Sequence, residues 1–443
     1  MSLESQPNNN RALEALRAEL ANPIIADLGE QVIKHIPSYG ECKTFPEHTT
    51  QYPEIVKEAI AMIVKEYNQV MGKLITGAKE NETDYRYCIN PDTGDATPLG
   101  LQVDMIPLPP QFLASCANGD FTLEEIRQAI KYSIFEIENS LGMTNLLEGV
   151  SPNFRQNMRQ SLEALRDKYG KEIILFTATQ AKYNGILATE LEHTSEEPIT
   201  PEQVREILGF DDIVGPNNFD PEKLKNVLFY VRASLPIANL RKPGSVVEES
   251  LFANDGIREY VRARTITPNV DNPNGAEDTK LNDTKAYMTM ENMGMGVECN
   301  SYDDLYKDGT LTDQLLQYLA NCGINSEDVL TGKVEIRVKP LKYSYGCYGQ
   351  LKGRITDSKF RRDLNKEIGK RGAYLAQVEM TTMTAQDSNT GVNYIGADRN
   401  FVFRKCDGET TFTGFRNLIP LDSTEGKKGN AHGGKEMVLA LTN

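Results

Sequence analysis

Several patterns that would indicate a particular chemistry are missing from this chain of 443 residues. It has no tryptophan and only four histidines, which are too dispersed for a histidine-based metal centre. Its seven cysteines form no Cys-x-x-Cys pair, which fits reduced cytoplasmic thiols better than a disulfide framework or a zinc site. A Gly-x-Ser-x-Gly elbow and a Walker-type phosphate loop are also absent. The sequence therefore gives no support to serine-hydrolase or P-loop chemistry.

Long apolar runs and an excess of positive charge are missing as well. No run approaches the roughly 18 residues that a membrane-spanning helix requires, and residues 1–10 lack the basic and apolar regions of a signal peptide. The net charge of −15 and the pI near 5.0 argue against nucleic-acid binding through bulk charge. We expect a cytoplasmic globular protein that binds neither membrane nor nucleic acid. Homo-oligomerisation stays open.

Helical periodicity dominates the first part of the chain. Apolar residues recur at three- and four-residue steps in segments that predict helices over 11–36, 53–75, 122–141 and 152–169. Thr122 and Glu125 are spaced as a capping box before the third of these helices. The turn-rich stretch 81–111 reads as a long connection. We therefore expect a mainly helical N-terminal region over residues 1–165.

From residue 172 onward the pattern changes to short apolar runs that alternate with helical stretches. These runs predict buried strands at 172–178, 212–214 and 226–232, with helices at 181–192 and 201–208. This alternation is typical of an open α/β sheet, which we place in a second region, 166–267. The Pro/Asn/Asp-rich stretch 268–283 reads as a linker into a third region, 268–443. There we expect helices at 311–319 and 359–370, and strands at 333–339, 373–380, 393–403 and 410–415.

One strand of the third region ends in a lysine and runs into a glycine-containing loop. Lys339 closes the predicted strand, and Gly346, Gly349 and Gly353 follow it. Glycines allow the backbone to approach an anion closely, and a lysine can supply the compensating charge. Taken alone, the stretch favours a strand and a surface hairpin with solvated lysines. However, residues 333–371 carry a local net charge of +8 in an acidic chain, which fits a polyanion such as a nucleoside triphosphate.

The order of the motifs in residues 260–434 resembles the ATP-grasp ligases, in particular the peptide-ligase branch that includes tubulin–tyrosine ligase. The motifs are Leu281-Asn-Asp-Thr-Lys285, the strand and loop after Lys339, Leu375-Ala-Gln-Val-Glu-Met380, Asp398-Arg399, and Phe415-Arg416 with Asn430-Ala-His-Gly-Gly434. The resemblance implies an open α/β pre-grasp domain followed by two lobes with antiparallel sheets that hold ATP between them. The fold class expected is thus α/β (α+β), with the helical N-terminal region as an addition.

The resemblance also implies roles for individual residues. Those expected to bind ATP are Lys285, Lys339, Gly346, Gly349, Gly353, Gln377, Glu379 and Asp398. Those expected to act on the transferred phosphoryl group or the acyl phosphate are Arg399, Arg416, Asn430 and His432. His432 has a second interpretation, in which it only fixes its loop. The family places its magnesium ligands beyond the Gly-Gly pair, where this chain has few residues left; Asp422, Glu425 and Glu436 are candidates, and the ligands stay unassigned.

The function implied is ATP-dependent ligation of a carboxylate to an amine through an acyl phosphate, with Mg²⁺ as cofactor and small molecules or peptides as substrates. The missing magnesium ligands favour an alternative, a non-catalytic nucleotide-binding or scaffold protein with a degenerate ATP-grasp fold.

Overall fold

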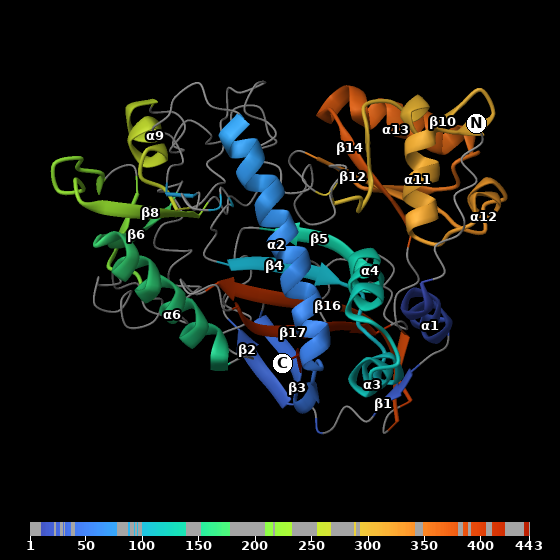
Figure 1. The fold of residues 1–443 in the computed structure, drawn as a ribbon, viewed down its shortest axis with the longest axis horizontal. Coiled ribbons are helices and arrows are strands. Elements are labelled where there is room, and N and C mark those ends of the chain that lie inside the picture. Colours follow the sequence, from blue (N-terminus) through green and yellow to red (C-terminus); the bar gives the residue numbers. More distant parts are fainter. Residues whose placement is uncertain are drawn as a thin grey trace.

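The chain combines helices with antiparallel and parallel sheets in a computed structural model (Figure 1). Among the residues that the structure describes, no helix is long and apolar enough to cross a membrane. The described residues are 10–21, 24–26, 30, 32–36, 40–77, 87–88, 93, 95, 100–138, 152–177, 209–215, 218–232, 255–266, 288, 293–341, 349–379, 384–388, 391–404, 410–420 and 438–442.

The largest sheet has nine strands and draws them from both ends of the chain. Its main path runs β1-β15-β16-β17-β18-β3-β2, while β4 pairs with β16 and with β5. All pairings are antiparallel except β1 with β15 and β18 with β3. The strands are β1 (Ile24–Ala26), β2 (Val32–Ile36), β3 (Gly40–Thr50), β4 (Gly100–Met105), β5 (Ile134–Glu138), β15 (Thr384–Asp387), β16 (Asn393–Arg404), β17 (Thr410–Pro420) and β18 (Val438–Thr442).

Two further sheets flank the large one in Figure 1. A four-stranded antiparallel sheet, here called the small sheet, has the order β13-β12-β14-β9, and a three-stranded parallel sheet has the order β7-β6-β8. A short hairpin of β10 (Tyr306–Lys307) and β11 (Thr310–Leu311) stands apart. The strands of these two sheets are β6 (Glu172–Thr177), β7 (Asp212–Val214), β8 (Val227–Arg232), β9 (Val297–Cys299), β12 (Ile336–Pro340), β13 (Leu351–Gly353) and β14 (Tyr374–Val378).

The helices cover these sheets, and α2 crosses one face of the large sheet in Figure 1. Apolar residues of α2, β4 and the small sheet belong to one continuous core, which includes Ile60, Val103 and Val338. The helices are α1 (Arg11–Leu20), α2 (Glu54–Gly77), α3 (Pro110–Asn118), α4 (Leu123–Ser133), α6 (Pro152–Tyr169), α9 (Asp255–Arg262), α11 (Asp313–Asn321), α12 (Ser326–Leu330) and α13 (Ser358–Arg371), with a 3₁₀ turn at Tyr302–Asp304.

Many predicted elements are confirmed. Helices α2, α6, α11 and α13 lie where the periodicity predicts them, and the three strands predicted in the second region form the parallel sheet. Strands β12, β14, β16 and β17 are confirmed in the third region. The helices predicted at 181–192 and 201–208 and the linker at 268–283 lie outside the described residues.

Two predicted helices are wrong in their second halves. The helix predicted over 11–36 ends at Leu20, and β1 and β2 follow, because Pro23 disfavours helical backbone just before it. The helix predicted over 122–141 ends at Ser133 and continues as β5. The apolar spacing carries on through Ile134 and Ile137, but both are β-branched, and pairing with β4 makes the segment a strand.

The first 138 residues are therefore more than a helical region. They contribute five of the nine strands of the large sheet, and β4 lies within the stretch that the sequence predicts as a connection. Every residue of β4 is buried. The N-terminal part of the chain thus completes a sheet whose other strands come from its C-terminal end.

The capping box at the start of α4 gives a direct test of local structure. Thr122 Oγ1 accepts from the Glu125 backbone N–H at 3.2 Å, and Glu125 Oε2 accepts from the Thr122 N–H at 2.9 Å. We expect Thr122→Ala to lower the free energy of unfolding by about 1 kcal/mol, measured by urea denaturation. Thr122→Ser keeps the hydroxyl and is the control. An equal loss in both variants would contradict the capping role.

Candidate functional site

One face of the small sheet carries three of the residues predicted to bind ATP. Lys339 pairs with Leu375 across β12 and β14, and Arg337 pairs with Gln377, so Lys339, Gln377 and Glu379 lie on the same face. The opposite face, which includes Ile336, is covered by α13: Gly353 lies opposite Ile336, and a Cβ on Gly353 would come within 2.8 Å of Phe360. The three polar residues therefore face away from that helix.

Two of these polar side chains are already engaged. Gln377 is buried and donates from Nε2 to the Met295 carbonyl at 2.9 Å. Glu379 accepts from Arg337, with Nη2–Oε1 at 2.6 Å, and from Lys352 at 3.3 Å. Burial alone would raise the pKa of Glu379, but the hydrogen bonds from Arg337 outweigh it and the pKa is lowered. Glu379 is thus an ionised acceptor.

The predicted glycines have different surroundings. Gly349 has a φ of +80°, a conformation that favours glycine, in the turn before β13. Gly353 is accounted for by its packing against Phe360, since any side chain there would collide with that ring. Gly346 lies outside the described part of the chain, so the structure places two of the three glycines beside β12.

On the large sheet, three charged residues form a row across three neighbouring strands. Arg399 of β16 lies directly opposite Asp104 of β4, and Asp104 lies directly opposite Glu136 of β5. Residues paired in this way project from the same face. Arg399 Nη2 is 3.5 Å from Asp104 Oδ2. An arginine predicted for phosphate binding is therefore joined by two carboxylates that the sequence reading missed.

Lys339 reaches this row from the small sheet. Its Nζ donates to the carbonyl oxygen of Phe135 at 2.6 Å and lies 5.1 Å from the centroid of the Phe135 ring. Phe135 precedes Glu136 on β5, and the Lys339 charge is close enough to Asp104 to lower the pKa of that carboxyl. We call Lys339, Arg399, Asp104, Glu136 and the adjoining Gln102 the charged cluster.

The pKa of Asp104 reflects its burial within the cluster. Burial is the main reason that the pKa of Asp104 is raised from 3.8 to about 6, and the neighbouring Glu136 raises it further. Arg399, Gln102 and Lys339 act in the opposite direction without cancelling the rise.

Asp398 and Arg416 were predicted to meet the nucleotide or the acyl phosphate, but they project from the face opposite to Arg399. Adjacent residues of a strand alternate between faces, and Asp398 pairs with Arg416 across β16 and β17. The two make a bidentate ion pair of 2.6 and 2.9 Å, buried to 0 % and 4 % exposure. Tyr52, just before α2, donates to the same carboxylate. On this face the pair holds β16, β17 and the start of α2 together.

The remaining predicted residues, Lys285, Asn430 and His432, lie outside the described residues, as do Asp422, Glu425 and Glu436. Within the described ranges, no group of three or more His, Cys, Asp or Glu side chains is placed to hold a metal ion. The oxygen donors that come together are Asp104 and Glu136, with the Gln102 amide beside them. Hard divalent cations take such ligands, and Mg²⁺ often uses only one or two protein carboxylates, with water and phosphate oxygens completing the shell.

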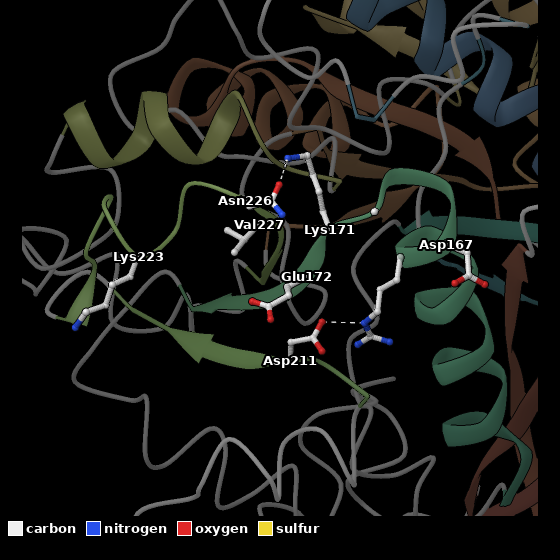
Figure 2. A pocket seen from close by; sticks show the side chains of 9 residues that line it. Asp167, Lys171, Glu172, Asp211, Lys223, Asn226 and Val227 are labelled. Atoms are coloured by element: carbon white, nitrogen blue, oxygen red, sulfur yellow. Dashed lines mark hydrogen bonds and ion pairs between the residues drawn. The ribbon is translucent and has the colours of Figure 1, made fainter.

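A separate pocket of about 510 Å³ lies at the amino ends of the parallel strands (Figure 2). Two of its charged groups are already hydrogen-bonded: Arg166 Nε is 2.8 Å from Asp211 Oδ2, and Lys171 Nζ is 2.8 Å from the Asn226 amide oxygen Oδ1. Open α/β sheets bind ligands at the opposite, carboxyl ends of their strands. None of its lining residues belongs to the charged cluster, which is the stronger candidate.

No model of a known protein family matches the chain, and no curated protein matches its sequence.

The buried pair on the far face of β16 gives a test of its structural role. Arg416→Met leaves the Asp398 carboxylate without its cation, so we expect the free energy of unfolding to fall by about 3 to 5 kcal/mol, measured by urea denaturation. The double variant Asp398→Leu/Arg416→Met removes both charges and should recover most of that loss. Arg362→Met, at an exposed position of α13, is the control, and a loss no larger than in this control would refute the role.

Proposed function

We propose that this chain is an ATP-dependent carboxylate–amine ligase in which the small sheet and the large sheet hold the nucleotide between them, as in the ATP-grasp architecture. One observation carries the proposal. Lys339, predicted from its position before a glycine-containing loop, and Arg399, predicted from the Asp-Arg step, come from different sheets and both act on Asp104: Arg399 pairs with its carboxylate, and the Lys339 charge lowers its pKa. Sequence motifs that are far apart thus converge on one place.

In this proposal the nucleotide lies along the Lys339 face of the small sheet. Glu379 stays ionised and can accept a hydrogen bond from an adenine amino group, while Gln377 supports the strand through the Met295 carbonyl. Lys339 is buried to 3 % exposure, so its charge acts in a medium of low dielectric constant and attracts phosphate oxygens more strongly than in water.

Arg399 supplies the second cation on the opposite side. Phosphoryl transfer spreads negative charge over the equatorial oxygens of the transferred group, so fixed positive groups around it lower the barrier. The guanidinium is held on β16 by cross-strand pairing and by Asp104, which limits the reorganisation needed during reaction. No nucleophilic side chain is required, which agrees with the absence of a serine elbow.

The cluster also fits a magnesium ion. Asp104 and Glu136 are adjacent carboxylates, burial and the neighbouring Glu136 raise the pKa of Asp104, and the buried Gln102 Oε1 has no hydrogen-bond partner among the described residues. Asp104 and Glu136 would hold the ion. When bound, it would neutralise phosphate charge and orient the transferred group.

The proposed function predicts nucleotide binding that depends on Lys339. We expect Mg·ATP to bind the wild type in calorimetric titration, and Lys339→Met to weaken binding at least tenfold, about 1.4 kcal/mol, because the lost charge faces the phosphates. Lys366→Met, on the exposed side of α13, removes a lysine remote from β12 and is the control. No binding by the wild type would refute the proposal.

The proposed function also predicts that ATP is cleaved to ADP when the right carboxylate and amine are present. The wild type is screened for ADP release with pooled amino acids and dipeptides as carboxylate and amine donors, and the active pair is then used with variants. We expect Asp104→Asn and Glu136→Gln each to reduce kcat on the order of 100-fold, since each removes transition-state charge compensation. Binding without ADP release from any pair would instead favour the non-catalytic nucleotide-binding alternative.

A further inference from the structure

Gln102 is a fully buried amide in the middle of β4. It lies two residues before Asp104 and therefore on the same face of the sheet, and its side chain is 0 % exposed. Its Nε2 donates to Asp104 Oδ1 at 3.0 Å. Its Oε1 is buried and finds no hydrogen-bond partner within the described part of the chain.

This arrangement is unfavourable for stability. A buried amide oxygen without a donor loses its hydration and gains nothing in return, whereas an apolar side chain at the same place carries no such penalty. The strand neighbours on the other face, Leu101 and Val103, show the apolar residues that a buried strand ordinarily carries. Stability alone does not account for a glutamine here.

The side chain does, however, determine how Asp104 is turned. With Oδ1 bound to the amide, the other oxygen, Oδ2, is directed to Arg399 at 3.5 Å. A carboxylate in a buried site could otherwise rotate toward either cation of the charged cluster. The hydrogen bond from Gln102 selects one orientation.

We propose that Gln102 is a positioning residue for Asp104, holding the carboxylate so that Oδ2, together with Glu136, is presented to a divalent cation and to the nucleotide phosphates. This role rests on the proposed function, because the cation is the one that the ligase site would use. Gln102 acts through Asp104 and need not touch the substrate.

The test uses Gln102→Met, which keeps the length of the side chain and removes both polar groups. We expect the dissociation constant for Mn²⁺, used as the probe in the presence of ATP and followed by electron paramagnetic resonance, to rise at least tenfold. The urea midpoint of unfolding should change little, because removal of the unsatisfied amide oxygen offsets the loss of the hydrogen bond to Asp104 Oδ1. Gln102→Leu is a second variant with the same expected outcome should methionine prevent folding.

Asn400→Leu is the matched control. Asn400 is another fully buried amide, on the neighbouring strand β16 but on the opposite face, where its side chain influences Tyr52. Its replacement should lower the urea midpoint and leave Mn²⁺ affinity unchanged. The two variants are thus expected to have different effects: Gln102→Met changes the affinity for Mn²⁺, and Asn400→Leu changes the urea midpoint.

Two outcomes overturn the inference, and they are distinguishable. If the wild type binds Mn²⁺ and ATP but Gln102→Met binds Mn²⁺ within twofold of it, or if the only effect is a lower urea midpoint, the positioning role is refuted while the proposed function stands. If the wild type binds neither Mn²⁺ nor Mg·ATP, both proposals are refuted.

Discussion

The arrangement of the candidate site depends on the register between β4 and β16. That register places Arg399 opposite Asp104, and the next pairing places Glu136 opposite Asp104. A slip of one residue would move Asp104 to the other face of the sheet, because side chains alternate. Leu101, Val103 and Met105 prevent such a slip: all three are at most 1 % exposed on the face packed in the core that includes α2, and a slip would exchange them for Gln102 and Asp104. The apolar side of β4 thereby fixes its polar side.

Strand β16 uses two consecutive charged residues for opposite purposes. Asp398 is held by Arg416 in two hydrogen bonds of 2.6 and 2.9 Å, which satisfy both carboxylate oxygens before Tyr52 adds a third contact. Arg399 stands only within ion-pair distance of Asp104, at 3.5 Å, longer than a charge-assisted hydrogen bond. The first pair is saturated and suited to holding strands together. The second is longer, and burial raises the pKa of its Asp104.

The sequence predicts those helices and strands whose formation depends on a local pattern of apolar residues. Helix α2 and strand β6 have unmistakable apolar periodicity, and Lys339 and Arg399 were identified from short motifs in a consistent order. Asp104 and Glu136 were missed, because β5 continues the apolar spacing of α4 and β4 lies in a turn-rich stretch. A signal was present: Ile134-Phe-Glu-Ile-Glu138 alternates in the manner of a half-buried strand with acids on one side. A local pattern cannot show which distant residue contacts that strand: Lys339, which donates a hydrogen bond to the Phe135 carbonyl, lies 204 positions away.

Lys339 connects the two sheets through a neutral acceptor, the Phe135 carbonyl. A phosphate oxygen is a stronger acceptor for an ammonium group than a carbonyl, because the hydrogen bond is then charged on both sides. In the proposed reaction a nucleotide would therefore compete with Phe135 for Lys339 on favourable terms, and would do so where Arg399 and the two carboxylates already stand. Lys339, Asp104 and Gln102 are buried, so the free-energy cost of removing water from them arises during folding and not during the reaction. The unfavourable features of the cluster, a raised carboxyl pKa and an unsatisfied amide oxygen, are what a site organised in advance for a charged ligand is expected to carry.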